Sequence, residues 1–79
     1  MHISARVQGG LRLINVSDIF YFHAEHKYVT VFYTDGQVLI EDALKSLEEK
    51  FTNSFIRIHR NALVAIDQLK ALERDNSGH

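Results

Sequence analysis

Two short polar clusters hold most of the side chains that could do chemistry. The first, His23-Ala24-Glu25-His26-Lys27-Tyr28, separates two runs of β-forming residues. Its histidines and glutamate could bind a metal ion, but they do not match the His-Glu-x-x-His helical motif. A metal site needs about three or four ligands, so further ligands would have to come from elsewhere, and we predict no metal. The cluster is then a solvated turn, or a loop that offers His26, Lys27 and Tyr28 to a partner.

The second cluster is Arg57-Ile58-His59-Arg60-Asn61, in which Arg57 and His59 share one face of a predicted strand. Its last two residues follow the end of that strand. Arginine and asparagine side chains suit phosphate oxygens and base edges, so the cluster is a candidate nucleic-acid contact. Its arginines could equally pair with Glu48 and Glu49 of a predicted helix, where an exposed pair would stabilise by only ~0–1 kcal/mol. The residues alone leave both interpretations open.

The residues give little support for catalysis. Ser17, Asp18 and His23 are of the types that form a nucleophile and its base, but the chain has no Gly-x-Ser-x-Gly turn and no oxyanion-hole loop. It also lacks a glycine-rich loop that could cradle a phosphate. The absence of cysteine excludes thiol catalysis, disulfide bonds and Cys-based zinc sites. We therefore predict that the protein is not an enzyme and uses no cofactor.

Size and hydropathy predict one domain that stays out of the membrane. The chain has 79 residues, fewer than the ~100–150 of a common domain. Its longest apolar runs, residues 19–22 and 62–66, fall far short of the ~20 residues that a membrane span needs. Residues 1–6 lack the apolar core of a signal peptide. We expect a cytoplasmic domain.

The charged residues are balanced in number but unevenly placed. The formal net charge is −1, which argues against a strongly basic nucleic-acid binder, whose isoelectric point usually exceeds ~9. Residues 51–66 nevertheless contain Arg57 and Arg60 and no acid, whereas residues 41–50 contain more acids than lysines. This distribution predicts a basic edge opposite an acidic helix.

The strongest β signal is a predicted hairpin of residues 28–33 and 38–40, which are rich in β-branched and aromatic side chains. Asp35-Gly36 between them is typical of a two-residue type I′ turn. Such a turn would pair Tyr33 with Val38. One face of the hairpin would then carry Val29, Val31, Tyr33, Val38 and Ile40.

The rest of the chain alternates between strand and helix patterns. Leu44, Leu47 and Phe51 form a helical stripe, which predicts one short helix over about 42–51. Five aromatic residues of the strands could stack on bases, but their alternation favours core or cross-strand packing: Tyr21, Phe22, Tyr28, Phe32 and Tyr33. Further strands are predicted at residues 5–7, 11–14, 19–22, 55–59 and 62–66, and residues 73–79 have no pattern. The predicted fold is mostly β with one short helix.

This order of features closely resembles the LytTR DNA-binding domain, in particular that of the AlgR type of response regulator. The resemblance covers nearly the whole chain, and its most specific part is Phe55-Ile56-Arg57-Ile58-His59-Arg60-Asn61. The other matching segments are Asp18–Phe22, Lys27–Val31, Asp35-Gly36 and Leu44–Glu48. The resemblance implies an elongated, mostly-β arrangement of small antiparallel sheets with one short α-helix. It also implies that loops, rather than a recognition helix, enter successive major grooves.

For function, the resemblance implies sequence-specific binding to duplex promoter DNA by the effector domain of a two-component transcriptional regulator. Its first DNA-facing loop is similar to His26-Lys27-Tyr28, and its phosphate-contacting stretch to His59-Arg60-Asn61, with Arg57 just before it. Such regulators act as homodimers on paired half-sites, with a receiver domain upstream. Residues 1–79 would be a single domain of this type, without that receiver and without the C-terminal hairpin whose loop carries a further base-contacting arginine.

Two other functions explain some of the same residues. A small β-rich chain with unpaired strand edges could be a protein-interaction or dimerisation domain without DNA binding. The aromatic residues could instead bind single-stranded nucleic acid or RNA by stacking, with Tyr28 carrying much of the affinity.

Overall fold

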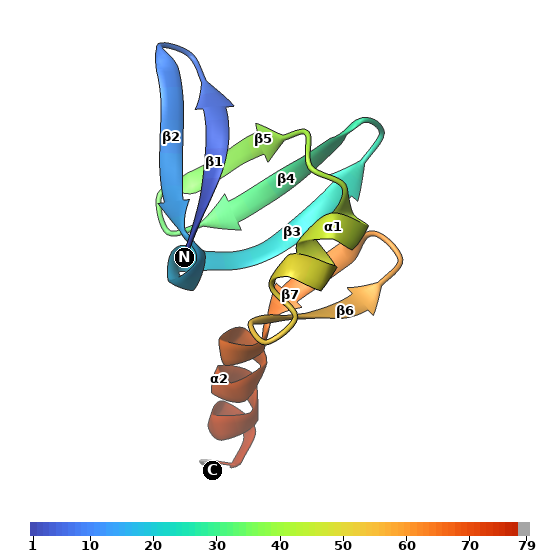
Figure 1. The fold of residues 1–79 in the computed structure, drawn as a ribbon. Coiled ribbons are helices and arrows are strands. Elements are labelled where there is room, and N and C mark those ends of the chain that lie inside the picture. Colours follow the sequence, from blue (N-terminus) through green and yellow to red (C-terminus); the bar gives the residue numbers. More distant parts are fainter. Residues whose placement is uncertain (78–79) are drawn as a thin grey trace.

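Within residues 1–77, which the computed structural model describes, seven strands form two antiparallel sheets (Figure 1). A two-stranded sheet has the order β1-β2, and a five-stranded sheet has the order β5-β4-β3-β7-β6. The strands are β1 (His2–Val7), β2 (Gly10–Asn15), β3 (Ile19–Glu25), β4 (Tyr28–Tyr33), β5 (Gly36–Ile40), β6 (Phe55–His59) and β7 (Ala62–Ala65). The helices are α1 (Leu44–Lys50), α2 (Ile66–Ser77) and a short 3-10 turn, η1 (Val16–Asp18). The predicted mostly-β class is confirmed.

The N-terminal hairpin β1–β2 turns where the sequence predicts it. Val7 pairs with Gly10, and Gly9 and Gly10 both have positive φ angles, which glycine adopts without steric cost. Arg12 ties the hairpin to the larger sheet, because its Nη1 donates a hydrogen bond to the Tyr33 hydroxyl at 2.9 Å. This bond raises the pKa of Arg12 above its ordinary value. The hairpin is therefore anchored at one face of the five-stranded sheet.

The β4–β5 hairpin forms as predicted, but the predicted register is wrong by two residues. Tyr33 pairs with Gly36 instead of Val38, so the turn lies at Thr34 and Asp35. The Thr34 N–H donates to the carbonyl of Asp18 at 3.0 Å and is not available to close the predicted turn. Because side chains alternate with a period of two, a shift of two leaves the predicted apolar face unchanged. Four of its five side chains are buried and Val38 packs partly buried against them.

Helix α1 presents the predicted stripe to the core but is shorter than predicted. It begins at Leu44 instead of about residue 42, because Ala43 at its N-cap is extended, and it ends at Lys50. Asp42 consequently lies before the helix and outside its first turn. Leu44, Leu47 and the C-cap residue Phe51 are all buried.

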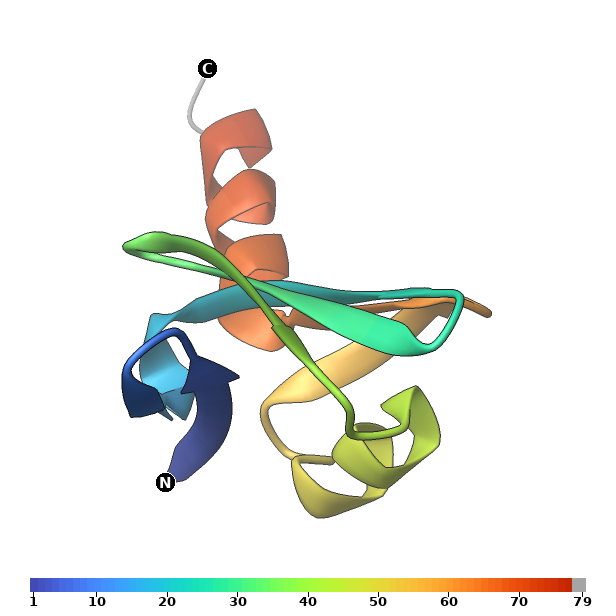
Figure 2. The same ribbon diagram turned by 90° about the horizontal axis from the view of Figure 1, so that it is seen from above.

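The core lies between one face of the five-stranded sheet and a layer made of α1 and the β1–β2 hairpin (Figure 2). Strand β3 runs through the middle of the sheet, and its Phe22 has no exposed surface. The ring of Phe22 packs against Phe55, which in turn meets Phe51 edge to face. Leu47 and Leu63 complete the most deeply buried part of this core.

Helix α2 is not predicted by the sequence analysis. The strand predicted over 62–66 ends at Ala65, and the helix continues from Ile66 through residues judged to have no pattern. The Ile66 N–H donates to the Ser54 carbonyl at 2.9 Å, and Asp67 lies in the first turn, where its charge is favourable. The last two residues of the patternless segment, 78 and 79, lie outside the described residues. No helix in the described part of the chain is long and apolar enough to cross a membrane.

Candidate nucleic-acid interface

The two polar clusters of the sequence lie at the same end of the five-stranded sheet. Strand β3 is antiparallel to both β4 and β7, so its C-terminal end lies beside the N-terminal end of β7. His23 pairs with Ala62, and the Ala24 N–H donates to the Asn61 carbonyl at 2.8 Å. The β3–β4 and β6–β7 turns therefore project together, as both ribbon views show (Figures 1 and 2). We call them the 26–28 loop and the 59–61 loop.

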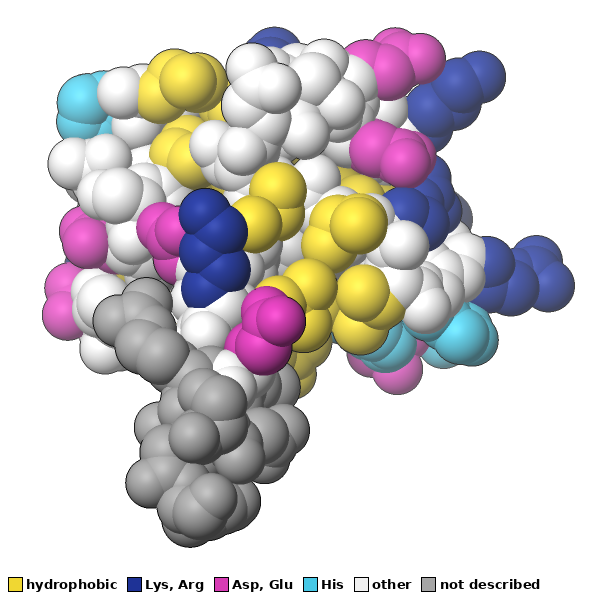
Figure 3. All heavy atoms as spheres, turned by 90° about the horizontal axis from the view of Figure 1, so that it is seen from below, with side chains coloured by type: hydrophobic (Ala, Val, Ile, Leu, Met, Phe, Trp, Pro, Cys, Tyr) yellow, Lys and Arg dark blue, Asp and Glu magenta, His cyan; other side chains and the backbone are white. Residues whose placement is uncertain are grey.

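The strand order sets the distance between the two loops. The 26–28 loop joins β3 to β4, and the 59–61 loop joins β6 to β7, which lies on the other side of β3. Neighbouring strands are ~4.8 Å apart, so the centres of the two hairpins are separated by two strand spacings, or roughly 10 Å. Figure 3 shows several Lys and Arg side chains, with His beside them, at this end of the molecule.

The 26–28 loop is a tight turn with exposed side chains. Glu25 pairs with Tyr28 across it, and His26 is the only non-glycine residue among the described ones with a positive φ, at 56°. His26, Lys27 and Tyr28 are all exposed, and none of them makes a side-chain hydrogen bond to another described residue. Tyr28 and Leu39 border a shallow hollow beside the turn. The backbone alone shapes this loop and leaves its side chains free.

The 59–61 loop is instead held by hydrogen bonds. The Asn61 N–H donates to Nδ1 of His59 at 3.1 Å, and Nη1 of Arg57 donates to the Arg60 carbonyl at 2.6 Å. Nδ1 of His59 can accept this bond only when it carries no proton, so the neutral ring has its proton on Nε2. Together with the bond from Ala24 N–H, three hydrogen bonds fix the backbone from Arg60 to Asn61.

The sequence leaves two roles open for Arg57, a nucleic-acid contact and an ion pair with the acidic helix. In the structure Arg57 forms the ion pair. Its Nη2 and Nε donate to the same oxygen of Glu48, Oε1, at 2.8 and 3.1 Å. The two side chains are 29% and 39% exposed. The expectation that the acidic helix lies opposite the basic edge is therefore wrong, since α1 packs beside β6. Arg60 is exposed and makes no salt bridge to a carboxylate of the described residues.

The remaining candidates are positioned for packing. Tyr21 stacks on Phe32 across β3 and β4 with ring centroids 4.3 Å apart, and Phe22 and Tyr33 are buried. The prediction of core and cross-strand packing is confirmed for these four aromatic residues, and Tyr28 alone is exposed at a loop. Among the side chains that the structure describes, no group of three His, Asp or Glu residues could hold a metal ion.

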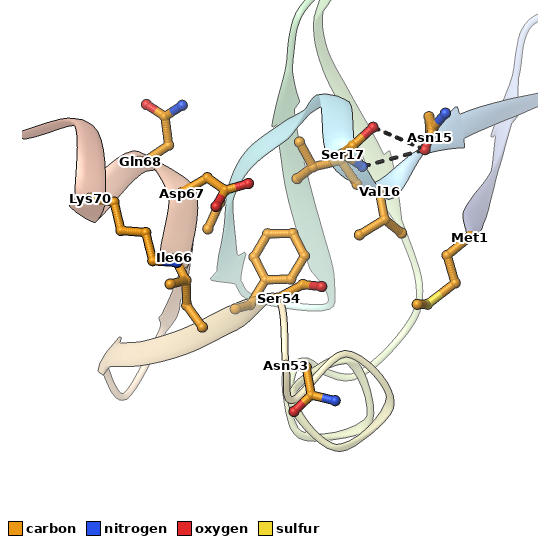
Figure 4. A pocket seen from close by; sticks show the side chains of 13 residues that line it. Met1, Asn15, Val16, Ser17, Asn53, Ser54, Ile66, Asp67, Gln68 and Lys70 are labelled. Carbon is orange, nitrogen blue, oxygen red and sulfur yellow. Dashed lines mark hydrogen bonds between the residues drawn. The ribbon is translucent and has the colours of Figure 1, made fainter.

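A hollow of about 300 Å³ lies at the opposite end of the sheet (Figure 4). It lies where β3 begins and β7 ends, and segments far apart in the chain line it. Its polar side chains are those of Asn15, Ser17, Asn53, Ser54, Asp67, Gln68 and Lys70. Of these, Asn15 caps η1 by accepting from Ser17. No pattern in the sequence could predict the hollow, because the turns that form it meet only in the folded chain.

Comparisons with known proteins agree with this architecture. The model of the LytTr DNA-binding domain matches residues 9–79. The chain is 47% identical over 78 residues to the "Positive alginate biosynthesis regulatory protein" of Pseudomonas aeruginosa, covering 99% of this chain and 32% of that protein. It thus spans about a third of the length of this curated relative.

A solved LytTr DNA-binding domain from Bacillus cereus has the same fold. It superimposes with a TM-score of 0.76 over 84% of this chain and 62% of the other, at 22% sequence identity. Sequence, family model and fold agree over most of the chain. The protein therefore belongs to the LytTr DNA-binding domain family.

Proposed function

We propose that this protein binds duplex DNA in a sequence-specific manner by inserting the 26–28 and 59–61 loops into the major groove. The observation that carries the proposal is that both loops leave the same end of one sheet, joined by the Ala24–Asn61 hydrogen bond. The spacing of roughly 10 Å between their centres is compatible with a major groove ~12 Å wide. Membership of a family of DNA-binding domains supports the same function.

The side chains divide into charged and reading groups. Lys27 and Arg60, both exposed, supply charge-assisted contacts to phosphate oxygens. His26, Tyr28 and Asn61 present donors, acceptors and an aromatic face to base edges. Arg57 and His59 complete the interface, with part of their hydrogen-bonding capacity used inside the 59–61 loop. Three of the nine Lys and Arg residues, Lys27, Arg57 and Arg60, lie at the proposed contact, so the net charge of the whole chain does not describe the charge there.

Fluorescence anisotropy across a salt series tests this proposal. A labelled duplex library of about 20 base pairs is first enriched for the tightest sequences. Arg60→Ala should then weaken binding and lower the slope of log K against log salt by about one unit. The matched control is Lys70→Ala, which removes the same charge from α2, the helix that begins at the opposite end of β7. Equal affinities and slopes for the two variants would refute the proposal, and so would tighter binding to single strands than to duplexes.

We further propose that the domain works as the effector of a cytoplasmic two-component transcriptional regulator that binds promoter DNA as a homodimer. In such a protein a receiver domain lies upstream and a C-terminal hairpin extends the DNA contact. The similarity to a regulatory protein three times as long supports this arrangement. Light scattering with and without duplex tests the stoichiometry. Two protomers on a DNA carrying paired half-sites are expected, and one protomer at saturation would contradict dimeric binding.

A second candidate function is interaction with another protein chain. Edge strand β6 carries Ile56 and Ile58, which are 47% and 57% exposed, and Figure 3 shows apolar side chains gathered on this side of the molecule. An exposed apolar edge can pair with a further strand. Concentration-dependent dimers without any affinity for duplex DNA would favour this function over the first.

A further inference from the structure

An acidic side chain is tied to the loop that we propose to bind DNA. Glu48 belongs to α1, nine residues before Arg57, and its Oε1 accepts from both Nη2 and Nε of Arg57. The remaining nitrogen of that guanidinium, Nη1, donates to the backbone carbonyl of Arg60 at 2.6 Å. One guanidinium thus joins the helix to the 59–61 loop.

The fold holds both partners of this clamp in place. Leu47, the residue before Glu48, is 1% exposed and fixes α1 against the sheet. Arg57 pairs with the buried Leu63 of β7, which turns its side chain to the same face of the sheet as α1. The pairing of β6 with β7 shifts register between Arg57 and His59, and the turn follows His59, so Arg57 lies close to the 59–61 loop. Among the side-chain hydrogen bonds of the described residues, only those of Arg57 join α1 to the 59–61 loop.

Removing the carboxylate would release the loop. An unpaired arginine samples many rotamers, and holding it in one costs side-chain entropy. The two bonds from Glu48 hold that rotamer in advance, and the bond to the Arg60 carbonyl depends on it. Without Glu48, the peptide that carries Arg60 loses one of the three bonds that fix it.

We propose that Glu48 is a positioning residue for DNA binding, acting through Arg57 on the backbone of Arg60. This inference rests on the proposed function of the 59–61 loop. It runs against simple electrostatics, in which an acid near a phosphate backbone weakens binding and its removal strengthens binding. Glu49, the next residue of α1, is exposed and forms no salt bridge with a described residue. Its removal should therefore strengthen DNA binding. Neighbouring acids on one helix then have opposite effects.

The test compares Glu48→Ala with Glu49→Ala in the anisotropy assay, using the same duplex for both. Alanine removes the acceptor oxygen of Glu48, which glutamine would keep. Glu49→Ala is expected to tighten binding slightly, most at low salt. Glu48→Ala is expected to weaken binding roughly threefold to tenfold, the size of effect that residues without ligand contact produce. Its salt slope should stay unchanged, because no phosphate contact is removed. In the free protein, the amide resonances of Arg60 and Asn61 should move in Glu48→Ala only.

Arg57→Lys provides the second variant. Lysine keeps the charge but cannot bond to Glu48 and to the Arg60 carbonyl in the fork geometry of a guanidinium. It should weaken binding as much as Glu48→Ala does, and the double variant should be no weaker than either single one. If Glu48→Ala fails to fold, Arg57→Lys is judged by the same criteria.

Two results would overturn the inference while leaving the proposed function intact. Binding by Glu48→Ala that equals or exceeds that of the wild type means that the loop needs no clamp. A steeper salt slope in that variant means that the released Arg57 binds a phosphate itself. Failure of the wild-type protein to bind any duplex would instead refute the proposed function.

Discussion

The 26–28 and 59–61 loops leave the same sheet end but are built in different ways. In the 26–28 loop the strand pairing of Glu25 with Tyr28 and a left-handed residue, His26, make the turn, and the side chains are unused. In the 59–61 loop the side chains of His59 and Arg57 form hydrogen bonds with the backbone of the turn itself. In the first loop the backbone sets the shape and the side chains stay available for recognition. In the second loop the same side chains serve both purposes. Side-chain substitutions should therefore act on binding alone in the first loop, except where they change the backbone freedom of His26, and on both binding and stability in the second.

The largest effect is expected where both loops share a support. Phe22 is fully buried on β3, which carries the 26–28 loop and pairs with β7, which carries the 59–61 loop. Phe22→Ala should destabilise the domain by about 3–5 kcal/mol, a large part of the ~5–15 kcal/mol of a typical domain. Binding through both loops should be lost together. Thermal unfolding followed by circular dichroism measures the change, and a melting temperature close to that of the wild type would show that β3 is not the common support.

A smaller effect is expected at His59. His59→Ala removes the acceptor for the Asn61 N–H and should cost about 0.5–1.5 kcal/mol of stability together with DNA affinity. His59→Asn is the matched control, because its side-chain oxygen can accept the same hydrogen bond. Urea unfolding should rank the stabilities as wild type, His59→Asn and then His59→Ala. Equal stability of the two variants would remove the structural role assigned to Nδ1.

The smallest effect, with the opposite sign, is expected at His26. A left-handed conformation costs a non-glycine residue about 1–2 kcal/mol, and glycine avoids this at an entropic cost of about 0.5–1 kcal/mol. His26→Gly should therefore stabilise the domain by about 0.5 kcal/mol while weakening DNA binding. Urea unfolding should show the higher stability of this variant, and fluorescence anisotropy should show its lower affinity for DNA. A loss of stability would mean that the His26 side chain helps to form its turn.

Local patterns predicted the elements better than their connections. The period-two runs and the stripe of Leu44, Leu47 and Phe51 predict the strands and α1, since alternation and helical spacing reflect burial directly. The predicted register of β4 and β5 was wrong because the Thr34 N–H donates to the Asp18 carbonyl, a contact that no local pattern indicates. Helix α2 was missed because the apolar run 62–66 suggested a strand through Ile66, where the helix begins.

For the candidate site too, the sequence indicated the local clusters but not how the fold brings them together. Residue types alone indicated both polar clusters, and the pairing of Arg57 with Glu48 was one of two alternatives that charge left open. That the clusters share one sheet end depends on the pairing of β3 with β7, and three strands and a helix separate these two strands in the sequence. The positive φ of His26 and the acceptor role of His59 are properties of folded turns, and no spacing in the sequence indicates them.

A DNA-binding surface shared by the two loops is tested by a nuclear magnetic resonance titration of the ¹⁵N-labelled protein with the selected duplex. The amides of residues 26–28 and 59–61 are expected to shift together with one midpoint. The turn at Gln8 and Gly9, on the separate β1–β2 hairpin, should stay unchanged. Shifts confined to one of the two loops, or centred on the β1–β2 turn, would contradict a shared DNA-binding surface.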